Sequence, residues 1–276
     1  MVSPDTLELL AEVVRSGGPW RIHGRGTKAA LCLDNDASPI STLALRGLVE
    51  WSPNDQVVVV RPGTPIEDLQ DELRTQGQCL PMPAGDEVGP LPAGLPGTVG
   101  GLVAMNLPHA LQGPCGGVRD WVLGLTVVRP DGTIAKCGSH VVKNVAGYDV
   151  QKLMIGARGT LGVIAEVVLR TFPLRALPAP ALTGEGAIAL EHAWIQRTLR
   201  ADFAGLCHAA RDVPHRADEA SSTLWAGSAL PRFAEDWVLA PGREPLPEGP
   251  MREWMRRAKS IFDPDARLNP GAMGAW

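Results

Sequence analysis

The sequence predicts an α+β fold, in which short strands and helices alternate and are joined by loops rich in glycine. Two runs of apolar residues, 56–61 and 162–171, have the length and composition of buried strands. Two segments with helical spacing, 6–16 and 65–76, each stop at glycine. With 276 residues the chain can bury a sizeable core, so we expect one large domain or two smaller ones.

The N-terminal elements have clear boundary signals. Helix 6–16 is followed by Gly17 and Gly18, and strand 20–23 leads directly into a glycine-rich loop at 24–28. Strand 56–61 ends at Pro62-Gly63. For the helix at 65–76 we expect Thr64 as the N-cap, Pro65 at the first helical position and Glu67 as the capping-box partner, with an end at Gly77.

The middle of the chain contains a loop, a glycine-rich helix and a hairpin. Residues 80–97 are too rich in proline and glycine for regular structure. Segment 98–106 predicts a short helix whose first turn is nearly free of side chains, so that its unpaired N–H groups would suit an anion. Strands at 121–129 and 133–137 flank Pro130-Asp131-Gly132, which predicts a hairpin.

The C-terminal part is harder to assign. The composition changes at 175–180, where we expect the first domain to end. Beyond it, 185–200 is an amphipathic helix candidate, 201–249 has no clear pattern, and 251–262 predicts a helix.

Composition and charge exclude several classes of function. The formal net charge of −4 gives no basic footprint for nucleic acid. No apolar run approaches the roughly 20 residues of a membrane-spanning helix, and no secretory signal is visible at the N-terminus. The five cysteines are scattered and form no Cys-x-x-Cys pair, so we expect reduced thiols in a cytosol-like compartment and no metal or iron–sulfur site in this chain.

The most informative segment is the run 143–164, a glycine-rich turn that leads into an apolar strand. Glycines let backbone N–H groups approach a bound anion or a flat ring. Alone, such a run is equally compatible with turns in an ordinary α/β domain. Two further glycine-rich loops upstream, at 24–28 and 94–101, favour a flavin site built from all three.

Four ordered motifs resemble the FAD-linked oxidases with a vanillyl-alcohol-oxidase-type (PCMH-type) FAD-binding domain. They are Gly24-Arg25-Gly26-Thr27, Thr98-Val99-Gly100-Gly101, Arg119-Asp120-Trp121-Val122-Leu123-Gly124 and the run from Lys143. Within this family, Lys-Asn-Val-Ala-Gly-Tyr-Asp and the C-terminal Asp-Pro-x-x-x-Leu-Asn-Pro-Gly are most similar to the FAD-binding subunit of glycolate oxidase. The resemblance implies two α/β subdomains that clasp FAD, with the pyrophosphate between the first two loops.

The implied organisation is a PCMH-type FAD-binding domain at 1–175, a reduced cap at 176–249 and a segment at 250–276 that returns to the FAD domain. The cofactor is expected to be held without a covalent bond, because His23 precedes the first glycine loop, whereas the attached histidine of some relatives follows it. The expected cofactor-binding residues are Gly24, Arg25, Gly26, Thr27, Lys28, Gly97, Thr98, Gly100, Gly101, Asn106, Gly113, Asp120, Gly147, Asp149, Lys152, Gly156, Gly159, Thr160, Gly162 and Ile164.

Catalytic residues cannot be assigned from the sequence. The metal motif and the Glu-His-Gly motif of the catalytic relatives are missing, and Glu191-His192 is followed by Ala193 in an expected helix. A 2-hydroxy acid needs a base near its hydroxyl and a cation for its carboxylate. Arg119, Arg158 and Arg170 are candidate cations without an assigned role.

The resemblance implies an FAD-binding subunit of a glycolate oxidase-like complex that oxidises a small 2-hydroxy acid to the 2-oxo acid, acting as a flavin electron-transfer subunit. Its expected partners are a catalytic FAD subunit and an iron–sulfur subunit, in the cytoplasm or at the inner face of the plasma membrane through the complex. Two alternatives stay open: a scaffold subunit without catalysis, and a stand-alone FAD oxidoreductase for another 2-hydroxy acid such as D-lactate.

Overall fold

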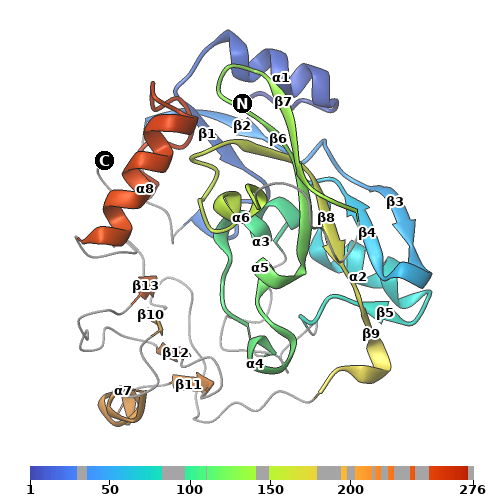
Figure 1. The fold of residues 1–276 in the computed structure, drawn as a ribbon, viewed down its shortest axis with the longest axis vertical. Helices are drawn as coiled ribbons and strands as arrows, with labels where there is room; N and C mark the ends of the chain where they lie inside the picture. The colour runs from blue at the N-terminus through green and yellow to red at the C-terminus, as the bar shows by residue number, and fades with distance from the viewer. Residues whose placement is uncertain are drawn as a thin grey trace.

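The computed structural model describes residues 1–29, 36–82, 97–109, 111–140, 149–178, 194–197, 203–212, 215–218, 223–226, 237–239 and 249–272. Strands and helices alternate along these residues, which confirms the predicted α+β class. Figure 1 shows a five-stranded sheet with helices packed around it and a separate group of strands at the other end of the molecule.

The five-stranded sheet is antiparallel and has the strand order β3-β4-β8-β6-β7. Its strands are β3 (Leu48–Ser52), β4 (Val57–Val60), β8 (Val163–Arg170), β6 (Val122–Val128) and β7 (Ile134–Gly138). The four valines of β4 are all buried, as a central strand covered on both faces requires. Strand β4 and strand β8, both predicted from their apolar runs, lie side by side, with Val58 opposite Leu169.

The largest core cluster fills one face of this sheet. It joins sheet residues to α2 (Ile66–Arg74), α3 (Val99–Met105), α5 (Val118–Trp121) and α6 (Gln151–Met154). Trp121 is a fully buried member of this cluster, and Ala258 and Phe262 of α8 (Pro250–Phe262) pack against the cluster. Helix α8 confirms the helix predicted at 251–262.

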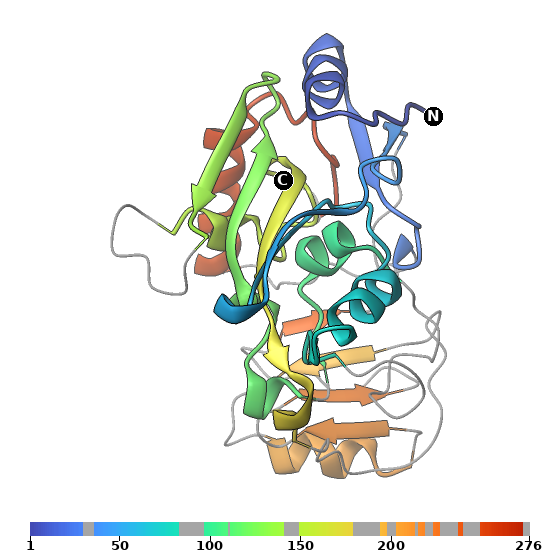
Figure 2. The same cartoon turned by 90° about the vertical axis from the view of Figure 1, so that its right-hand side faces the viewer.

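A small parallel sheet of β1 (Trp20–His23) and β2 (Ser38–Ser41) lies beside α1 (Leu7–Ser16). Thr6 caps α1, because its hydroxyl accepts a hydrogen bond from the Leu9 N–H at 3.2 Å. Leu10 and Val14 of α1 pack with Ile40 of β2 and Val163 of β8 in a second core cluster. This cluster fixes the small sheet against the start of β8 (Figure 2).

The predicted hairpin is confirmed, since β6 and β7 pair in antiparallel register from Val128↔Ile134 to Gly124↔Gly138. Asp131 shapes its turn: the Oδ1 atom accepts a hydrogen bond from the Thr133 N–H at 2.8 Å, and Gly132 has a φ of +79°.

The predicted cap of α2 is wrong. Pro65 takes the N-cap position without a side-chain hydrogen bond, and the Thr64 hydroxyl accepts from the Gly47 N–H at 2.9 Å instead. Glu67 forms an ion pair with Arg25 instead of closing a capping box. Thr64 therefore serves a contact 17 residues away, which local spacing cannot reveal.

The helix predicted at 185–200 is also wrong where the structure describes it. Trp194–Arg197 form strand β10, which pairs with β12 (Thr223–Ala226) on one side and β13 (Trp237–Leu239) on the other. Strand β11 (His215–Asp218) completes this sheet, and α7 (Phe203–Ala210) lies near it. Two strand partners outweigh the weak helical periodicity of the segment, because strand formation depends strongly on its neighbours.

Short elements complete the description. They are η2 (Pro53–Asp55), β5 (Gln78–Cys79), α4 (Gln112–Cys115), β9 (Phe172–Pro173) and η3 (Leu174–Ala176). Among the described residues, no helix is long and apolar enough to cross a membrane. The boundaries predicted for the three domains stay a prediction.

Candidate functional site

A cavity of about 700 Å³ opens where the small parallel sheet meets α3 and the start of β8. This volume lies within the ordinary range of ligand and cofactor pockets. Its lining comprises Arg21, Ile22, His23, Gly24, Arg25, Gly26, Thr27, Lys28, Ala29, Thr42, Pro62, Thr98, Gly100, Gly101, Ala104, Met105, Arg158, Gly159, Gly162, Val163, Ile164, Asn269 and Ala272. The three glycine-rich segments predicted to cooperate all contribute to this lining.

The first glycine loop follows β1 and presents its backbone to the cavity. Gly26 has a φ of +72°, a conformation that favours glycine, and a Cβ added there would meet no atom within 4 Å. Within the described parts of the chain, no group accepts a hydrogen bond from the N–H of Gly26 or Thr27. These two N–H groups are therefore available to a ligand.

The second glycine loop differs from its prediction, because the N–H groups at the start of α3 are not unpaired. The Val99 N–H donates to the Thr64 carbonyl at 2.9 Å, and the Gly100 N–H donates to the Pro62 carbonyl at 2.8 Å. The Gly101 N–H donates to the Thr98 hydroxyl at 3.4 Å. The expected anion site of free helix N–H groups is thus wrong, since the loop after β4 takes two of them.

The glycines of this second loop provide room instead. A Cβ on Gly100 would lie 2.7 Å from the Pro62 Cβ, so this glycine lets the chain pack against itself. A Cβ on Gly101 would meet only the Thr98 hydroxyl oxygen, at 3.5 Å. A Cβ on Gly24 would collide with the same hydroxyl, so the first two loops are in close contact. Gly101 therefore leaves space for a ligand, whereas Gly24 and Gly100 permit the loops to meet.

The third segment contributes Gly159, Gly162 and Ile164 to the cavity. Its other predicted residues that the structure describes lie outside the lining and have partners within the protein. The Gly156 N–H donates to the Val103 carbonyl at 3.0 Å, and the Thr160 hydroxyl donates to the Ala157 carbonyl at 2.6 Å. The first bond attaches the segment to α3, and the second closes a turn within the segment.

Asp149 and Lys152 also lie away from the cavity. The Asp149 Oδ1 atom accepts from the Gln151 amide at 3.0 Å, and the Lys152 ammonium donates to the Val122 carbonyl at 3.2 Å and to the Arg119 carbonyl. Burial, followed by the charge of Arg119, lowers the pKa of Lys152 below its usual value. Gly147 and the rest of 141–148 lie outside the described residues.

Four more predicted residues lie outside the lining. Gly97 lies against the Lys28 ammonium, since a Cβ there would collide with it. Asn106 ends α3 in the left-handed conformation, with a φ of 47°. Gly113 belongs to α4, and the Asp120 carboxylate accepts from the Gly117 N–H at 2.8 Å at the start of α5.

The charged residues described in the cavity lining are all basic: Arg21, Arg25, Lys28 and Arg158. No carboxylate belongs to this described lining. Arg25 is paired with Glu67, and the Lys28 ammonium lies 3.4 Å from the Thr27 hydroxyl. The excess of positive charge favours an anionic ligand.

Of the three arginines considered as substrate cations, Arg158 alone lines the cavity. It is 5% exposed, and its Nη1 atom donates to the Ala272 carbonyl at 2.8 Å. Arg119 donates to the Lys152 carbonyl, and Arg170 lies over the Phe172 ring at 5.0 Å. These last two arginines have structural roles.

The histidines offer no assembled catalytic group in the described parts of the chain. The His23 Nδ1 atom lies 2.9 Å from the Gly24 carbonyl, at the cavity wall. His208 belongs to α7 and contacts Arg211. Glu191 and His192 lie outside the described residues, and the residues that are described contain no metal-binding group of His, Cys, Asp and Glu.

Several lining residues were missed by sequence reasoning. Asn269 and Ala272 are the most informative of them, because they bring the C-terminal end of the chain into the cavity wall. The Leu-Asn-Pro-Gly run at 268–271 is the sequence feature that could have indicated them, but its own residues do not show that it reaches the cavity.

Comparison with known proteins gives the family. Residues 1–138 match the model of a family described as "FAD binding domain". Glycolate oxidase subunit GlcE of Escherichia coli is 32% identical over 208 residues, which are 73% of this chain and 56% of that protein. A D-lactate dehydrogenase of Anaerostipes hadrus is 34% identical over 134 residues, 49% of this chain and 26% of that protein.

A D-2-hydroxyglutarate dehydrogenase of Xanthomonas citri is 33% identical over 158 residues, 57% of this chain and 31% of that protein. The matched part thus spans between about a quarter and just over half of these relatives. Among solved structures, an alkyldihydroxyacetonephosphate synthase has a TM-score of 0.49 and 16% identity, covering 75% of this chain and 36% of that one. Since the family model matches half of the sequence, the chain belongs to the family of FAD-binding domains, and its cofactor is FAD.

Proposed function

We propose that this chain is an FAD-binding subunit of a glycolate oxidase-like complex that oxidises a small 2-hydroxy acid to the 2-oxo acid. The observation that carries the proposal is the cavity itself, which has three glycine-rich walls and a described lining whose charges are all basic. The names of the relatives agree on substrate class, since glycolate, D-lactate and D-2-hydroxyglutarate are all 2-hydroxy acids.

The residues present fit FAD. A pyrophosphate needs close approach to the backbone and nearby positive charge. Gly26 and Gly101 leave the space that a side chain would fill, and Lys28 supplies an ammonium group beside Gly97. Bound FAD supplies the acceptor for a hydride from the carbon that carries the hydroxyl group.

In this proposal the protein holds the cofactor at three places. The first loop, with the N–H groups of Gly26 and Thr27, binds the pyrophosphate opposite Gly101. The backbone around Ile164 would hold the adenine end. Met105 and Val163, both apolar and both in the lining, would keep water away from the flat rings. Without a covalent bond, retention of FAD depends on these contacts alone.

What the cavity offers for catalysis supports a subunit role. Removal of the hydroxyl proton needs a base in contact with the substrate. The described lining contains no carboxylate, and its imidazole, that of His23, is in contact with the Gly24 carbonyl. We therefore propose that this chain transfers electrons, with a catalytic FAD subunit and an iron–sulfur subunit as its partners. The name of the relative from Escherichia coli, a subunit, supports an assembly of this kind.

A stand-alone oxidoreductase for D-lactate is the second candidate. The observation in its favour is the 34% identity to a D-lactate dehydrogenase over 134 residues, although these are 26% of that protein. A scaffold that keeps the fold without redox function is the third reading. The three differ in what FAD does when the substrate is added.

The test is the absorbance spectrum of the purified chain, recorded before and after anaerobic addition of glycolate and, separately, of D-lactate. We expect a yellow protein whose flavin is not bleached by either acid until the partner subunits are present. Bleaching of the isolated chain by D-lactate would favour the stand-alone enzyme. A colourless protein that takes up no FAD when reconstituted would contradict flavin binding, and with it the proposed function.

A further inference from the structure

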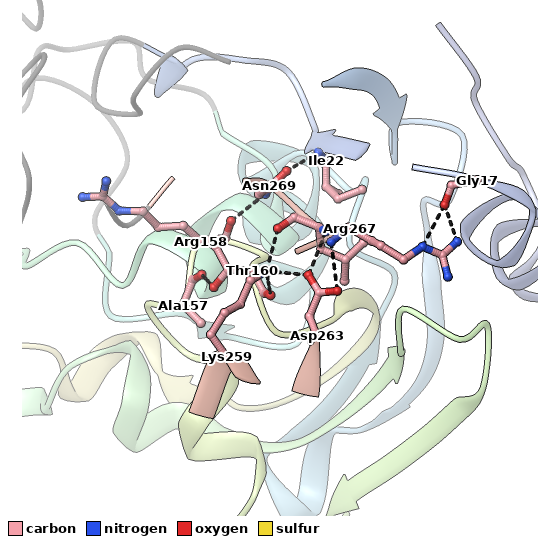
Figure 3. Close-up of polar contacts among 10 residues, drawn as sticks. Gly17, Ile22, Ala157, Arg158, Thr160, Lys259, Asp263, Arg267 and Asn269 are labelled. Carbon is pink, nitrogen blue, oxygen red and sulfur yellow. Dashed lines mark hydrogen bonds and ion pairs between the residues drawn. The ribbon is translucent and has the colours of Figure 1, made fainter. Parts of the chain in front are cut away.

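The end of the chain forms part of the cavity wall. Residues 263–272, here called the C-terminal hook, follow α8 and return to the small sheet, where Leu268 bridges Trp20. Asn269 and Ala272 of the hook line the cavity. Figure 3 shows that the hook lies between β1 and the turn around Arg158.

The Asn269 side chain joins two walls of the cavity. Its Oδ1 atom accepts a hydrogen bond from the Ile22 N–H at 2.5 Å, and its Nδ2 atom donates to the Arg158 carbonyl at 2.6 Å (Figure 3). Ile22 belongs to the strand that leads into the first glycine loop, and Arg158 precedes Gly159 of the third segment. One amide group therefore connects two segments that both reach the cofactor cavity.

The chemistry and the space at this point both require asparagine. One atom must accept and the other must donate, which an amide does and a carboxylate does not. A Cβ on Gly159 would lie 2.7 Å from the Asn269 Nδ2 atom, so the amide fits only against glycine. Asn269 itself is 7% exposed and has a φ of 40°, a conformation that asparagine tolerates better than most residues.

A buried ionic group anchors the hook close to this amide. The Lys259 ammonium pairs with the Asp263 carboxylate at 2.5 Å and donates to the carbonyls of Thr160 at 2.7 Å and Leu268 at 3.0 Å. The same carboxylate accepts from the N–H groups of Arg267 and Leu268. The hook is thus attached to the third segment at Thr160 as well as at Arg158.

We propose that Asn269 is a positioning residue of the FAD cavity, which sets the separation between the first glycine loop and the third glycine segment. The inference rests on the proposed placement of FAD between these walls. FAD that contacts both walls would gain affinity from a fixed separation, because pre-organised sites lose less entropy on binding. By linkage, bound FAD must stabilise the hook to the same extent.

The test compares Asn269→Gly with Ala266→Gly. Glycine accepts the φ of 40° without strain, so Asn269→Gly removes the two side-chain hydrogen bonds and little else. Ala266 is an exposed residue of the same hook with a φ of 50°, and its replacement by glycine controls for the change in backbone freedom. For each apoprotein, the dissociation constant of FAD is measured by flavin fluorescence, and the midpoint of thermal unfolding by circular dichroism.

We expect Asn269→Gly to raise the dissociation constant at least tenfold, while Ala266→Gly leaves it within about twofold of the wild type. Equal dissociation constants for Asn269→Gly and the wild type would overturn the inference and leave the proposed function untouched. If the wild type itself bound no FAD, the proposed function would be contradicted, whatever the variants did. The two failures are therefore distinguishable.

A second measurement does not depend on the folding of any variant. Hydrogen exchange of the wild-type protein is followed at the N–H groups of Asn269 and Ala272, which donate to the carbonyls of Trp20 and Asn269. We expect FAD to slow exchange at both positions by at least tenfold. Unchanged exchange in the presence of saturating FAD would overturn the coupling between hook and cofactor.

Discussion

At the scale of single residues, two neighbouring glycines in the second loop are needed for different reasons. Gly100 lets α3 pack against Pro62, whereas Gly101 faces the open space of the cavity. The sequence shows both as glycine and cannot distinguish them, because the difference depends on what lies within 4 Å of each absent Cβ.

Gly101→Val is expected to abolish FAD retention while the apoprotein stays folded. The new side chain would enter the cavity, and the Cβ would meet only the Thr98 hydroxyl at 3.5 Å. Valine has a higher helix propensity than glycine, so the substitution should not destabilise α3 itself. Flavin absorbance and the thermal midpoint measure the two effects.

Gly100→Ala is the contrasting variant. Its Cβ would lie 2.7 Å from the Pro62 Cβ, so this substitution should lower the thermal midpoint. Normal flavin content in Gly101→Val would contradict our placement of this loop.

His109 should make the stability of the protein depend on pH. The residue is 7% exposed, its Nε2 atom lies 3.1 Å from the Gly116 carbonyl, and its ring centroid is 4.6 Å from that of Trp121. Burial lowers the pKa of His109 from 6.5 to about 4, because the imidazolium form would lose its hydration. Between these values the unfolded chain binds a proton that the folded chain does not, so stability falls as the pH falls.

The expected loss is ~3 kcal/mol of unfolding free energy between about pH 6.5 and about pH 4. Urea unfolding at several pH values in this window measures it, with His109→Phe as the control that keeps an aromatic ring but cannot titrate. The difference between the two proteins isolates the contribution of His109. Parallel pH profiles for both would show that the imidazole does not titrate as its burial requires.

At the scale of elements, the sequence predicted those parts whose signal is local. Helix α1 with its stop at Gly17, the buried strand β4 and the β6–β7 hairpin all follow from short-range pattern and turn residues. The failures share a physical cause, which is a partner far away in sequence. Thr64 bonds to Gly47 instead of capping α2, and β10 exists because β12 and β13 pair with it.

The same distinction holds for the candidate site. The glycine loops were predictable because glycine itself is the signal, and they do meet at one cavity. Asn269 was not, because the bond between its Nδ2 atom and the Arg158 carbonyl spans 111 residues. The prediction of free N–H groups at the start of α3 was wrong for a related reason. Two of these groups donate to the carbonyls of Pro62 and Thr64, which belong to another loop.

Removal of the Arg267 side chain should lower the free energy of unfolding strongly, because this side chain connects the hook to α1 and to the hairpin turn. Its guanidinium donates to the carbonyls of Gly17 and Val14 at the end of α1 and to the Pro130 carbonyl in the hairpin turn (Figure 3 shows the contact with Gly17). Arg267→Met keeps much of the side-chain length but removes these donors, and the Val14 carbonyl then keeps only the Trp20 indole N–H at 3.4 Å. We expect a loss of about 2–4 kcal/mol in unfolding free energy, measured in urea.

The matched control is Arg257→Met on α8. The Arg257 side chain is 61% exposed, pairs with Glu253 at 3.2 Å and lies over the Trp254 ring at 5.2 Å. Such a surface contact contributes little, so a change within about 0.5 kcal/mol is expected. Equal losses in the two variants would mean that the bonds of Arg267 do not hold α1 and the hairpin together.

At the scale of the whole molecule, the cavity lies where segments from distant parts of the chain meet. Its walls come from β1 and the loop after it, from α3, from the start of β8 and from the C-terminal hook. These walls connect the small parallel sheet to the five-stranded sheet (Figure 2). A ligand that contacts all of them binds only when both sheets are folded and in place.

FAD should therefore stabilise the whole molecule and not one loop alone. For a ligand that binds the folded state only, a free concentration of 100 times the dissociation constant adds ~2.7 kcal/mol to the unfolding free energy. Urea unfolding of the apoprotein with and without FAD measures this gain, and one transition with an unchanged slope would show that both sheets respond together. Gly101→Val provides the matched control, because a protein that cannot hold FAD has nothing to gain from it. Two separate transitions, with FAD shifting only one, would show instead that the small sheet unfolds independently and that the cofactor is held by the five-stranded part.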